Sequence, residues 1–245
     1  MFFAKRIPRA QKQADNPYWM SFSDMMSGML IIFILVCTAL LLKLSQMEEQ
    51  VAANIEELKN ASKVRSEILQ DIFAELKAQG IDVLISDNDT ILRIPENSFH
   101  FKTGSFEITE DLRGTAELIG RALYTAITRE GRWGYLETVF VEGHSDSRKA
   151  PNYRMGNWEL SALRAISLWQ FWIGQTEYGP LLAQLRNREG KHLFSVSGYA
   201  ATRRIAEIED TEDAMRSNRR IDIRFTTRQP SIMEMEDVVS PLRGK

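Results

Sequence analysis

A continuous apolar run near the N-terminus constrains this chain more than any other feature. From Met20 to Leu42 the sequence reads MSFSDMMSGMLIIFILVCTALLL, and Asp24 is its one charged side chain. A helix of this length crosses a hydrocarbon core of about 30 Å. A cleaved signal peptide has a shorter apolar region and a small-x-small cleavage site, which is not found before Lys43. We therefore predict a retained transmembrane helix over 19–42, with a buried helix of a soluble protein as the alternative.

Positive charge is concentrated before the apolar run, whereas Lys43 is followed by Glu48 and Glu49. The positive-inside rule predicts a cytoplasmic tail over 1–18 and places the rest of the chain outside the membrane. An aromatic pair, Tyr18 and Trp19, stands where an interfacial belt is expected. The basic residues of the tail are Lys5, Arg6, Arg9 and Lys12.

The carboxylate of Asp24 is costly inside a membrane, because a charge near the bilayer centre costs roughly 2.5–3.5 kcal/mol. One interpretation is that Asp24 lies close enough to the cytoplasmic end to reach the interface or to favour the helix N-terminus. The other is an ion carrier, which loads a proton from one side and releases it to the other. A carrier needs a path lined by several helices, so it implies a multi-spanning partner.

Small and polar residues share the helix face of Asp24, which favours close contact with other helices. Hydroxyl oxygens on this helix also keep sodium open as the transported ion, although we favour protons. No other cofactor and no metal are expected. The residues that could support the ion are Ser21, Ser23, Ser27 and Thr38, and Gly28 lies on the same face.

Composition excludes several classes of protein. A net charge of −2 gives no reason to expect direct nucleic-acid binding. One cysteine, Cys37, rules out an internal disulfide and a cysteine-based zinc site, and three histidines offer little for a metal centre.

Two regions follow the apolar run. Segment 43–80 has no proline and its one glycine is Gly80, so apolar residues at helical spacing predict a helical linker that pairs with a second copy or serves as a solvated connector. From 81 to 227 short strands alternate with helices, which predicts an α/β sandwich, and 228–245 is a tail. We expect strands at 82–86, 90–95, 136–142, 192–197 and around 221–225, with helices around 112–127 and at 159–173.

The trio His144, Ser145 and Asp146 is not a hydrolase triad, because adjacent residues of a strand point to opposite faces. His144 and Asp146 could share a face, but two ligands do not make a metal site. No other catalytic set is present in the sequence, so an enzyme is not expected.

A binding pocket is the alternative for this region. Asp146 lies where a strand ends at Gly143, Asn157 can cap the next helix, and Arg164 lies two turns into it. Arg219 and Arg220 begin the last strand. An aspartate for an ammonium group and arginines for a carboxylate suit a zwitterionic ligand, and a structural ion-pair network is the competing interpretation.

Three motifs resemble the OmpA-like peptidoglycan-binding domain over about 81–227: Gly143-His144-Ser145-Asp146, Asn157-x-x-Leu160-Ser161-x-x-Arg164-Ala165, and Asn218-Arg219-Arg220. The segment 101–105 is also similar to that family. The resemblance implies that Asp146 and Arg164 hold the diaminopimelate group of the wall peptide. The full candidate set is Asp146, Asn157, Leu160, Arg164, Arg219 and Arg220.

Two details set the chain apart within that family. A serine replaces the usual threonine before Asp146, and the loop from Asp146 to Asn157 is longer than in outer-membrane members and lacks their glycine. A longer loop is similar to the MotB motor branch. The segment 17–29 (PYWMSFSDMMSGM) resembles the MotB-type stator helix, whose aspartate carries the motor's ion, although serines replace the usual alanines and no Phe-Phe pair follows.

The Pro-aromatic-Trp-x-Ser-aromatic-x-Asp pattern is most similar to the ZorB branch, the MotB-like subunits of Zorya anti-phage systems. This resemblance implies a dimer inside a pentameric ring of a MotA-like subunit, ZorA, in a bacterial inner membrane. It also implies a periplasmic wall-binding domain and a linker that serves as a plug. Flagellar MotB and a passive cell-wall anchor are the alternatives.

Overall fold

The computed structural model describes residues 17–228, which form parts of two compact units divided at Ala53 and Asn54. The predicted cytoplasmic basic residues and almost all of the predicted C-terminal tail lie outside the described residues.

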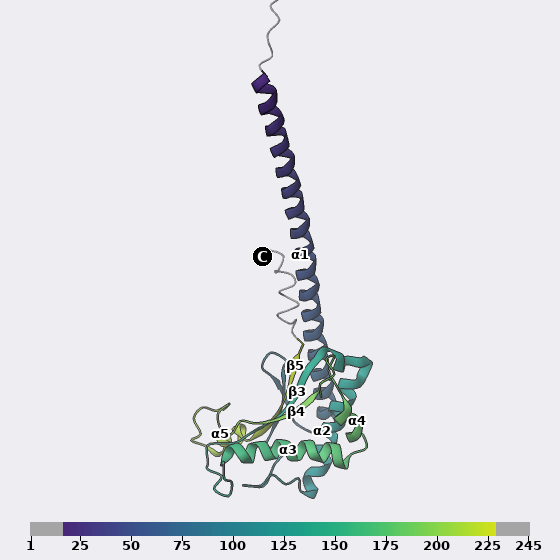
Figure 1. Ribbon diagram of the computed structural model, residues 1–245. Helices are drawn as coiled ribbons and strands as arrows, with labels where there is room; N and C mark the ends of the chain where they lie inside the picture. The colour runs from purple at the N-terminus through teal and green to yellow at the C-terminus, as the bar shows by residue number, and fades with distance from the viewer. Residues whose placement is uncertain (1–16, 229–245) are drawn as a thin grey trace, which may run out of the picture. The chain divides into compact units, whose positions relative to one another are not determined.

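The first unit is the N-terminal part of a single helix, α1 (Pro17–Ala78). This part is long and apolar enough to cross a membrane, with a mean hydropathy of 2.6 over 18 residues and side chains that are not buried within the chain. The predicted apolar helix is therefore present. Its helical conformation continues without a break through the predicted linker (Figure 1), because no proline or glycine interrupts the sequence between Gly28 and Gly80.

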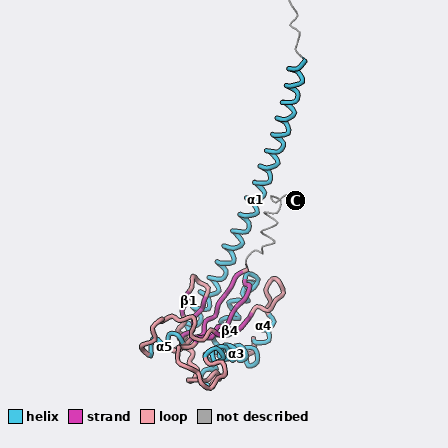
Figure 2. Tube along the Cα trace, turned by 60° about the vertical axis from the view of Figure 1, so that its left-hand side comes forward, coloured by secondary structure: helices cyan, strands magenta, loops and turns pink. Residues whose placement is uncertain are grey.

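The second unit is a mixed α/β domain built on one five-stranded sheet of order β1-β2-β5-β3-β4 (Figure 2), which confirms the predicted fold class. All neighbouring strands are antiparallel except β3 and β4, which are parallel. The crossover from β3 to β4 contains the helix α3 (Asn157–Gln175), as parallel neighbours require. The strands are β1 (Leu84–Ser86), β2 (Ile91–Pro95), β3 (Leu136–His144), β4 (Phe194–Gly198) and β5 (Arg220–Thr227).

The helices of this unit include three short ones that the sequence did not predict, the 3-10 helix η1 and the α-helices α4 and α5. The two α-helices have six and seven residues. The expected helix at 159–173 is two residues longer at each end, and the expected strand at 136–142 continues to His144. The helices are α2 (Glu110–Thr128), the 3-10 turn η1 (Arg129–Tyr135), α3 (Asn157–Gln175), α4 (Gly179–Gln184) and α5 (Glu212–Asn218).

Alternation along β5 separates an apolar face of the sheet from a charged one. Ile221, Ile223 and Phe225 are buried in the hydrophobic core together with apolar side chains of α2 and α3. The intervening residues Asp222 and Arg224 belong to the opposite face, since successive strand residues point to opposite sides. The helical layer therefore covers one face of the sheet, and the other face is charged.

The C-terminal turns of α1 belong to this core. Ile68, Leu69, Ile72 and Leu76 have no exposed surface and join the same cluster as the sheet residues. The packed domain therefore begins before the predicted boundary at residue 80, because it includes the last turns of the segment expected to be a linker. A helical pattern in the sequence does not reveal which part of a helix a distant domain covers.

Two glycines let α3 approach the sheet closely. A Cβ atom at Gly143 of β3 would overlap the carbonyl oxygen of Ser161, and one at Gly198 of β4 would overlap the backbone of Ala162. The absence of side chains at these positions brings the first turns of α3 onto the ends of two parallel strands. This contact fixes α3 next to the loop that follows β3 (Figure 1).

Candidate functional site

Strand direction brings three charged residues to one edge of the sheet. β3 pairs antiparallel with β5 so that His144 faces Arg220, and β2 pairs with β5 so that Pro95 faces Arg220. The end of β2, the end of β3 and the start of β5 therefore meet. Glu96, Asp146 and Arg219 lie just beyond these strand ends, and Arg219 contacts both carboxylates.

A pocket with a volume of about 770 Å³ opens at this edge. Its lining combines both signs of charge with the aromatic ring of Phe101 and the phenol of Tyr153. Tyr153 donates a hydrogen bond to the carbonyl oxygen of Gly104 at 2.7 Å, which connects two of the loops around the pocket. The charged and amide side chains include Glu96, Asp146, Arg148, Asn157, Arg164, Glu212 and Arg219.

The carboxylate of Asp146 is buried and accepts bonds from two guanidinium groups. Arg148 donates from Nε to Oδ2 at 2.8 Å and from Nη2 at 2.5 Å, and Arg219 donates from Nη1 to the same oxygen at 2.6 Å. Burial works to raise the pKa of Asp146, but the bonds from Arg148 and Arg219 outweigh it and hold the pKa below its ordinary value. Asp146 is therefore an anion at neutral pH.

Arg219 is held firmly by acidic groups on three sides. Its Nε and Nη2 form a bidentate pair with Glu96 at 2.6 and 2.5 Å, and Nη2 also bonds Glu212 at 2.7 Å. Burial would lower the pKa of Arg219, but hydrogen bonds to Glu96, Asp146 and Glu212 raise it above its ordinary value. Bidentate arginine–carboxylate pairs are geometrically specific, so the pair with Glu96 fixes the Arg219 guanidinium. The fixed guanidinium then orients Asp146 through its Nη1 bond.

Asn157 has a different role from the predicted one. Gly156, not Asn157, is the N-cap of α3, and no side chain caps this helix. Asn157 instead donates from Nδ2 to the carbonyl oxygens of Asp146 at 3.0 Å and Arg148 at 2.8 Å. The cap prediction was wrong, but the same amide fixes the backbone of the loop that carries Asp146.

Arg164 reaches the pocket from the second turn of α3, and Leu160 supplies buried apolar lining one turn earlier. The guanidinium of Arg164 donates from Nε to the carbonyl oxygen of Ser105 at 2.9 Å and lies 5.2 Å from the ring centre of Phe101. Nη1 has no hydrogen-bond partner among the described residues. Burial lowers the pKa of Arg164, yet arginine keeps its charge at any physiological pH.

Arg220 does not line this pocket, contrary to the prediction. Its Nε donates to Asp222 Oδ2 at 2.9 Å, and Nη2 donates to the carbonyl oxygen of Arg203 at 2.9 Å. Arg219 and Arg220 are neighbours at the start of a strand, and their side chains diverge for the same reason that excludes the trio at 144–146 as a triad. Arg220 belongs to the charged face of the sheet.

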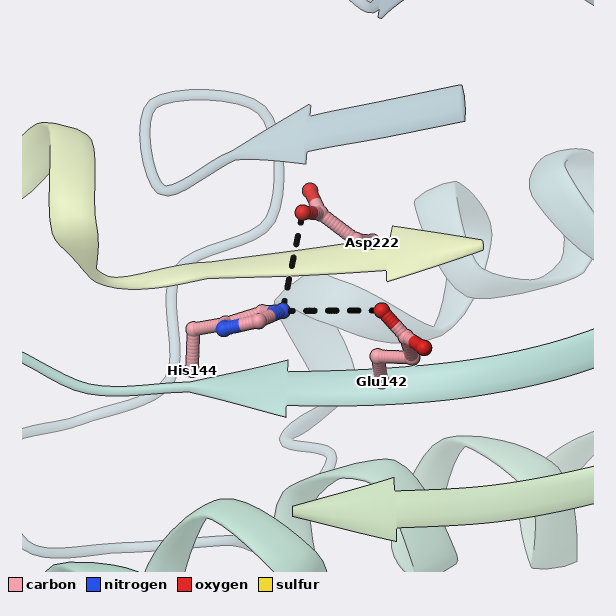
Figure 3. Close-up of side chains that lie close together, drawn as sticks. All are labelled: Glu142, His144 and Asp222. Atoms are coloured by element: carbon pink, nitrogen blue, oxygen red, sulfur yellow. Dashed lines mark ion pairs between the residues drawn. The ribbon is translucent and has the colours of Figure 1, made fainter. Parts of the chain in front are cut away.

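His144 on β3 belongs to the same charged face and points to two carboxylates (Figure 3). Its Nε2 lies 3.5 Å from Asp222 Oδ2 and 3.9 Å from Glu142 Oε2, and the ring stacks on Tyr199. Burial, followed by the charge of Arg220, lowers the pKa of His144 to about 3. The ring is therefore neutral at pH 7. It contacts Glu142 and Asp222 on the charged face of the sheet.

Glu142, His144 and Asp222 have ligand atoms within 4.8 Å of one another, a spacing at which three side chains could bind one metal ion. The oxygens of both acids are already bonded to guanidinium groups: Asp222 pairs with Arg93 at 3.0 Å, and Glu142 pairs with Arg224 at 3.0 Å. A divalent cation would have to displace these pairs from a region already rich in positive charge. The arrangement is that of a buried ion-pair network.

The predicted ion-carrying residues lie on the apolar part of α1. Asp24, Ser21 and Ser23 are exposed on the helix surface within the single chain. Ser27 donates its hydroxyl to the carbonyl oxygen of Ser23 at 2.8 Å, and Thr38 does the same to Ile34 at 2.8 Å. These bonds satisfy both hydroxyls within the helix, as lipid surroundings require.

The charged residues of the pocket that sequence reasoning missed include Glu96, Arg148 and Glu212. Glu96 directly follows a predicted strand, and Arg148 lies two residues after Asp146, so each had a local signal. Glu212 had none, because it comes from the short helix α5, whose placement depends on the whole fold.

The chain matches no protein-family model and no curated protein. Solved structures that are similar in part include the periplasmic domain of Helicobacter pylori MotB, with 20% identity and a TM-score of 0.49 over 67% of this chain and 94% of that chain. The cell wall anchor of the type VI secretion system from Pseudomonas aeruginosa is also 20% identical, with a TM-score of 0.46 over 65% and 97% of the two chains. A putative MotB-like protein from Desulfovibrio vulgaris has 16% identity and a TM-score of 0.45 over 74% and 96%.

Proposed function

We propose that this chain is the wall-anchored subunit of an ion-driven motor in a bacterial inner membrane. The observation that carries the proposal is the meeting of Asp146, Arg164 and Arg219 in one pocket at the sheet edge, where the OmpA-like motifs of the sequence also converge. These residues are the acid and the guanidinium groups that a zwitterionic wall peptide needs.

The ligand of the pocket is the diaminopimelate group of peptidoglycan, which carries an ammonium and a carboxylate on one carbon. Asp146 binds the ammonium, because its carboxylate stays ionised at neutral pH. Arg164 binds the carboxylate with its unpaired Nη1, and the ring of Phe101 lies below the same guanidinium. Asn157 and Leu160 hold and line the site, and Arg220 is left out of it.

The membrane part of the proposal assigns ion transport to Asp24. Two copies of the chain sit inside a pentameric ring of a MotA-like subunit, and Asp24 accepts a proton from outside and passes it to the cytoplasm. Neutralisation of the carboxylate and its return to the charged form change the contact with the ring, which drives rotation. The wall-bound domain holds the two copies still while the ring turns.

The N-terminal motif favours the ZorB branch over flagellar MotB, so the ring subunit is ZorA and the biological role is defence against phage. The Pro-aromatic-Trp-x-Ser-aromatic-x-Asp pattern supports this assignment. A neighbouring gene for a MotA-like protein with a long cytoplasmic tail, next to nuclease or helicase genes, is the expected context. Flagellar genes at that place would contradict it.

Sedimentation with purified sacculi tests the wall-binding part. Full-length protein in detergent is expected to pellet with sacculi, and Asp146→Asn or Arg164→Gln is expected to reduce the pelleted fraction at least about tenfold, since each loses a charge-assisted contact. Arg154→Gln is the matched control, because Arg154 is an exposed residue of the same loop and does not line the pocket.

Two further measurements make this test specific. Thermal unfolding must be compared for all four proteins, because the variants are informative only where the fold is retained. A soluble muropeptide that contains diaminopimelate is expected to compete with sacculi for the unsubstituted protein. If the Asp146 and Arg164 variants pelleted to the same extent as the unsubstituted protein, the proposed site would be wrong.

A further inference from the structure

The ammonium position of the proposed wall-peptide site is already filled by a side chain of the protein. Arg148 places Nε at 2.8 Å and Nη2 at 2.5 Å from Oδ2 of Asp146, where a ligand ammonium would have to donate its hydrogen bonds. With Arg219 on the same oxygen, the charge of Asp146 is compensated before any ligand binds. A cationic ligand group that binds Oδ2 must therefore replace one of the two guanidinium groups.

Arg148 is the group that can leave. Its side chain is 50% exposed, whereas that of Arg219 is 13% exposed. Arg219 also keeps a bidentate pair with Glu96, so its displacement would remove the bidentate partner of a second buried carboxylate. Displacement of Arg148 leaves only a solvated guanidinium, which costs far less.

The backbone and the surroundings of Arg148 suit a side chain with two positions. Asn157 holds the Arg148 carbonyl oxygen at 2.8 Å, and the Arg148 amide donates to Asp146 Oδ1 at 3.1 Å, so the backbone is fixed. Nη1 lies 3.2 Å from Glu212 Oε2, and the side chain of Glu212 is half exposed. A guanidinium that leaves Asp146 therefore keeps an acidic partner within reach.

We propose that Arg148 is a specificity-determining residue that acts as an internal competitor for the ligand ammonium at Asp146. This inference rests on the proposed function of the pocket. Ligands that bring a cationic group displace the Arg148 side chain toward Glu212 and gain the Asp146 contact. Ligands without such a group leave the Arg148–Asp146 pair in place and bind through Arg164 alone, so the pocket discriminates against wall peptides whose amine is blocked.

The size of the effect follows from the exposure of the pair. Arg148 is half exposed, whereas Asp146 is buried. Fully exposed ion pairs favour the closed arrangement by a factor of up to about five, so a factor of about five is the least that we expect for this pair. A site that is blocked to this extent loses affinity by the same factor, because only the open fraction binds. Removal of the charge at position 148 is therefore expected to strengthen binding of a free-amine ligand by at least about fivefold.

The test uses full-length protein in detergent and two soluble muropeptides, one with the free diaminopimelate amine and one with that amine acetylated. Dissociation constants are measured by calorimetry for the unsubstituted protein, Arg148→Gln, Arg148→Lys and the control Arg154→Gln. Arg148→Gln is expected to bind the free-amine peptide at least about fivefold more tightly and the acetylated peptide no more tightly. Arg148→Lys, which keeps the charge, and Arg154→Gln are expected to show no such gain.

The outcomes separate this inference from the function on which it rests. If the unsubstituted protein binds the free-amine peptide and Arg148→Gln binds it equally or more weakly, Arg148 is not a competitor, and the wall-binding function stands. An equal gain for both peptides also overturns the inference, because the effect would then not depend on the ammonium. If no protein, including Arg148→Gln, binds either peptide, the proposed function fails and the inference fails with it.

Discussion

At the scale of single residues, His144 shows how a polar side chain is held neutral by its surroundings. Both ring nitrogens are buried without a hydrogen-bond partner among the described residues, although two carboxylates lie within 4 Å of Nε2. Arg93, Arg220 and Arg203 surround the same acids and oppose a further positive charge. Both acids thus form ion pairs with arginines, and the histidine ring packs on Tyr199.

This arrangement predicts a pH dependence of stability. The pKa of His144 is lowered to about 3 in the folded protein, whereas an unfolded histidine titrates near its ordinary value of about 6.5. Between these values the unfolded chain binds more protons, so the free energy of unfolding falls as the pH falls. The expected slope between pH 6 and 5 is about 1 kcal/mol per pH unit.

Urea unfolding followed by tryptophan fluorescence measures this slope, since Trp172 is fully buried in the same domain. His144→Gln is expected to be less stable at pH 7, because it loses the stack with Tyr199, but to show a flatter profile between pH 6 and 5. If the stability of His144→Gln and that of the unsubstituted protein changed with pH at the same slope, His144 would not take up a proton on unfolding in this range. Below pH 5 the titration of the carboxylates would dominate the slope, so the comparison is made above it.

At the scale of elements, the sequence predicted every strand of the sheet and the helices α2 and α3 of the α/β domain. Period-2 alternation identified β5, and the apolar stripe of Leu112, Ala116, Ile119 and Leu123 identified α2. The short helices α4 and α5 were missed because one or two turns carry too little periodicity. Strand order was beyond the sequence as well, and it is strand order that brings Glu96 and Arg219 to Asp146.

The residues that line the candidate pocket were therefore predicted only in part. Asp146, Arg164 and Arg219 line the pocket as expected, and Asn157 contacts it through a different bond from the predicted cap. The inclusion of Arg220 overlooked the alternation of a strand. The pairing of Arg148 with Asp146 depends on the conformation of a loop, which local sequence patterns do not specify.

The packing of α1 gives a prediction that belongs to the element. Ile72 has no exposed surface and contacts the domain core, whereas Ile55, on the same helix, is 47% exposed. Ile72→Ala is expected to lower the free energy of unfolding of the domain by about 2–5 kcal/mol, because it leaves a cavity. Ile55→Ala is expected to cost less than about 1 kcal/mol when the chain is monomeric.

Urea denaturation at low protein concentration compares the two variants. If Ile72→Ala and Ile55→Ala lowered the free energy of unfolding equally, the domain core would not include the last turns of α1. A cost for Ile55→Ala that grows with protein concentration would instead reveal self-pairing of the segment that was predicted as a linker, since oligomer stability depends on concentration.

At the scale of the whole molecule, the proposed motor requires two charged sites with separable functions. Asp24 lies in the apolar part of α1 and Asp146 in the α/β domain, which belong to different compact units. Wall binding needs a carboxylate that stays ionised, and ion transport needs one that is reversibly neutralised. A variant at one site is therefore expected to leave the function of the other intact.

Asp24→Asn tests this separation, because asparagine keeps the size of the side chain but cannot carry a proton. The complex with a MotA-like subunit, reconstituted in vesicles, is expected to lose at least about 90% of its proton flux, as expected for a functional membrane carboxylate. Ser27→Ala is the control and is expected to keep the flux, since the Ser27 hydroxyl already bonds its own helix at the Ser23 carbonyl oxygen. Replacement of sodium by choline is expected to leave the flux unchanged. Both variants are expected to pellet with sacculi like the unsubstituted protein, whereas undiminished flux in Asp24→Asn would reduce the chain to a passive wall anchor.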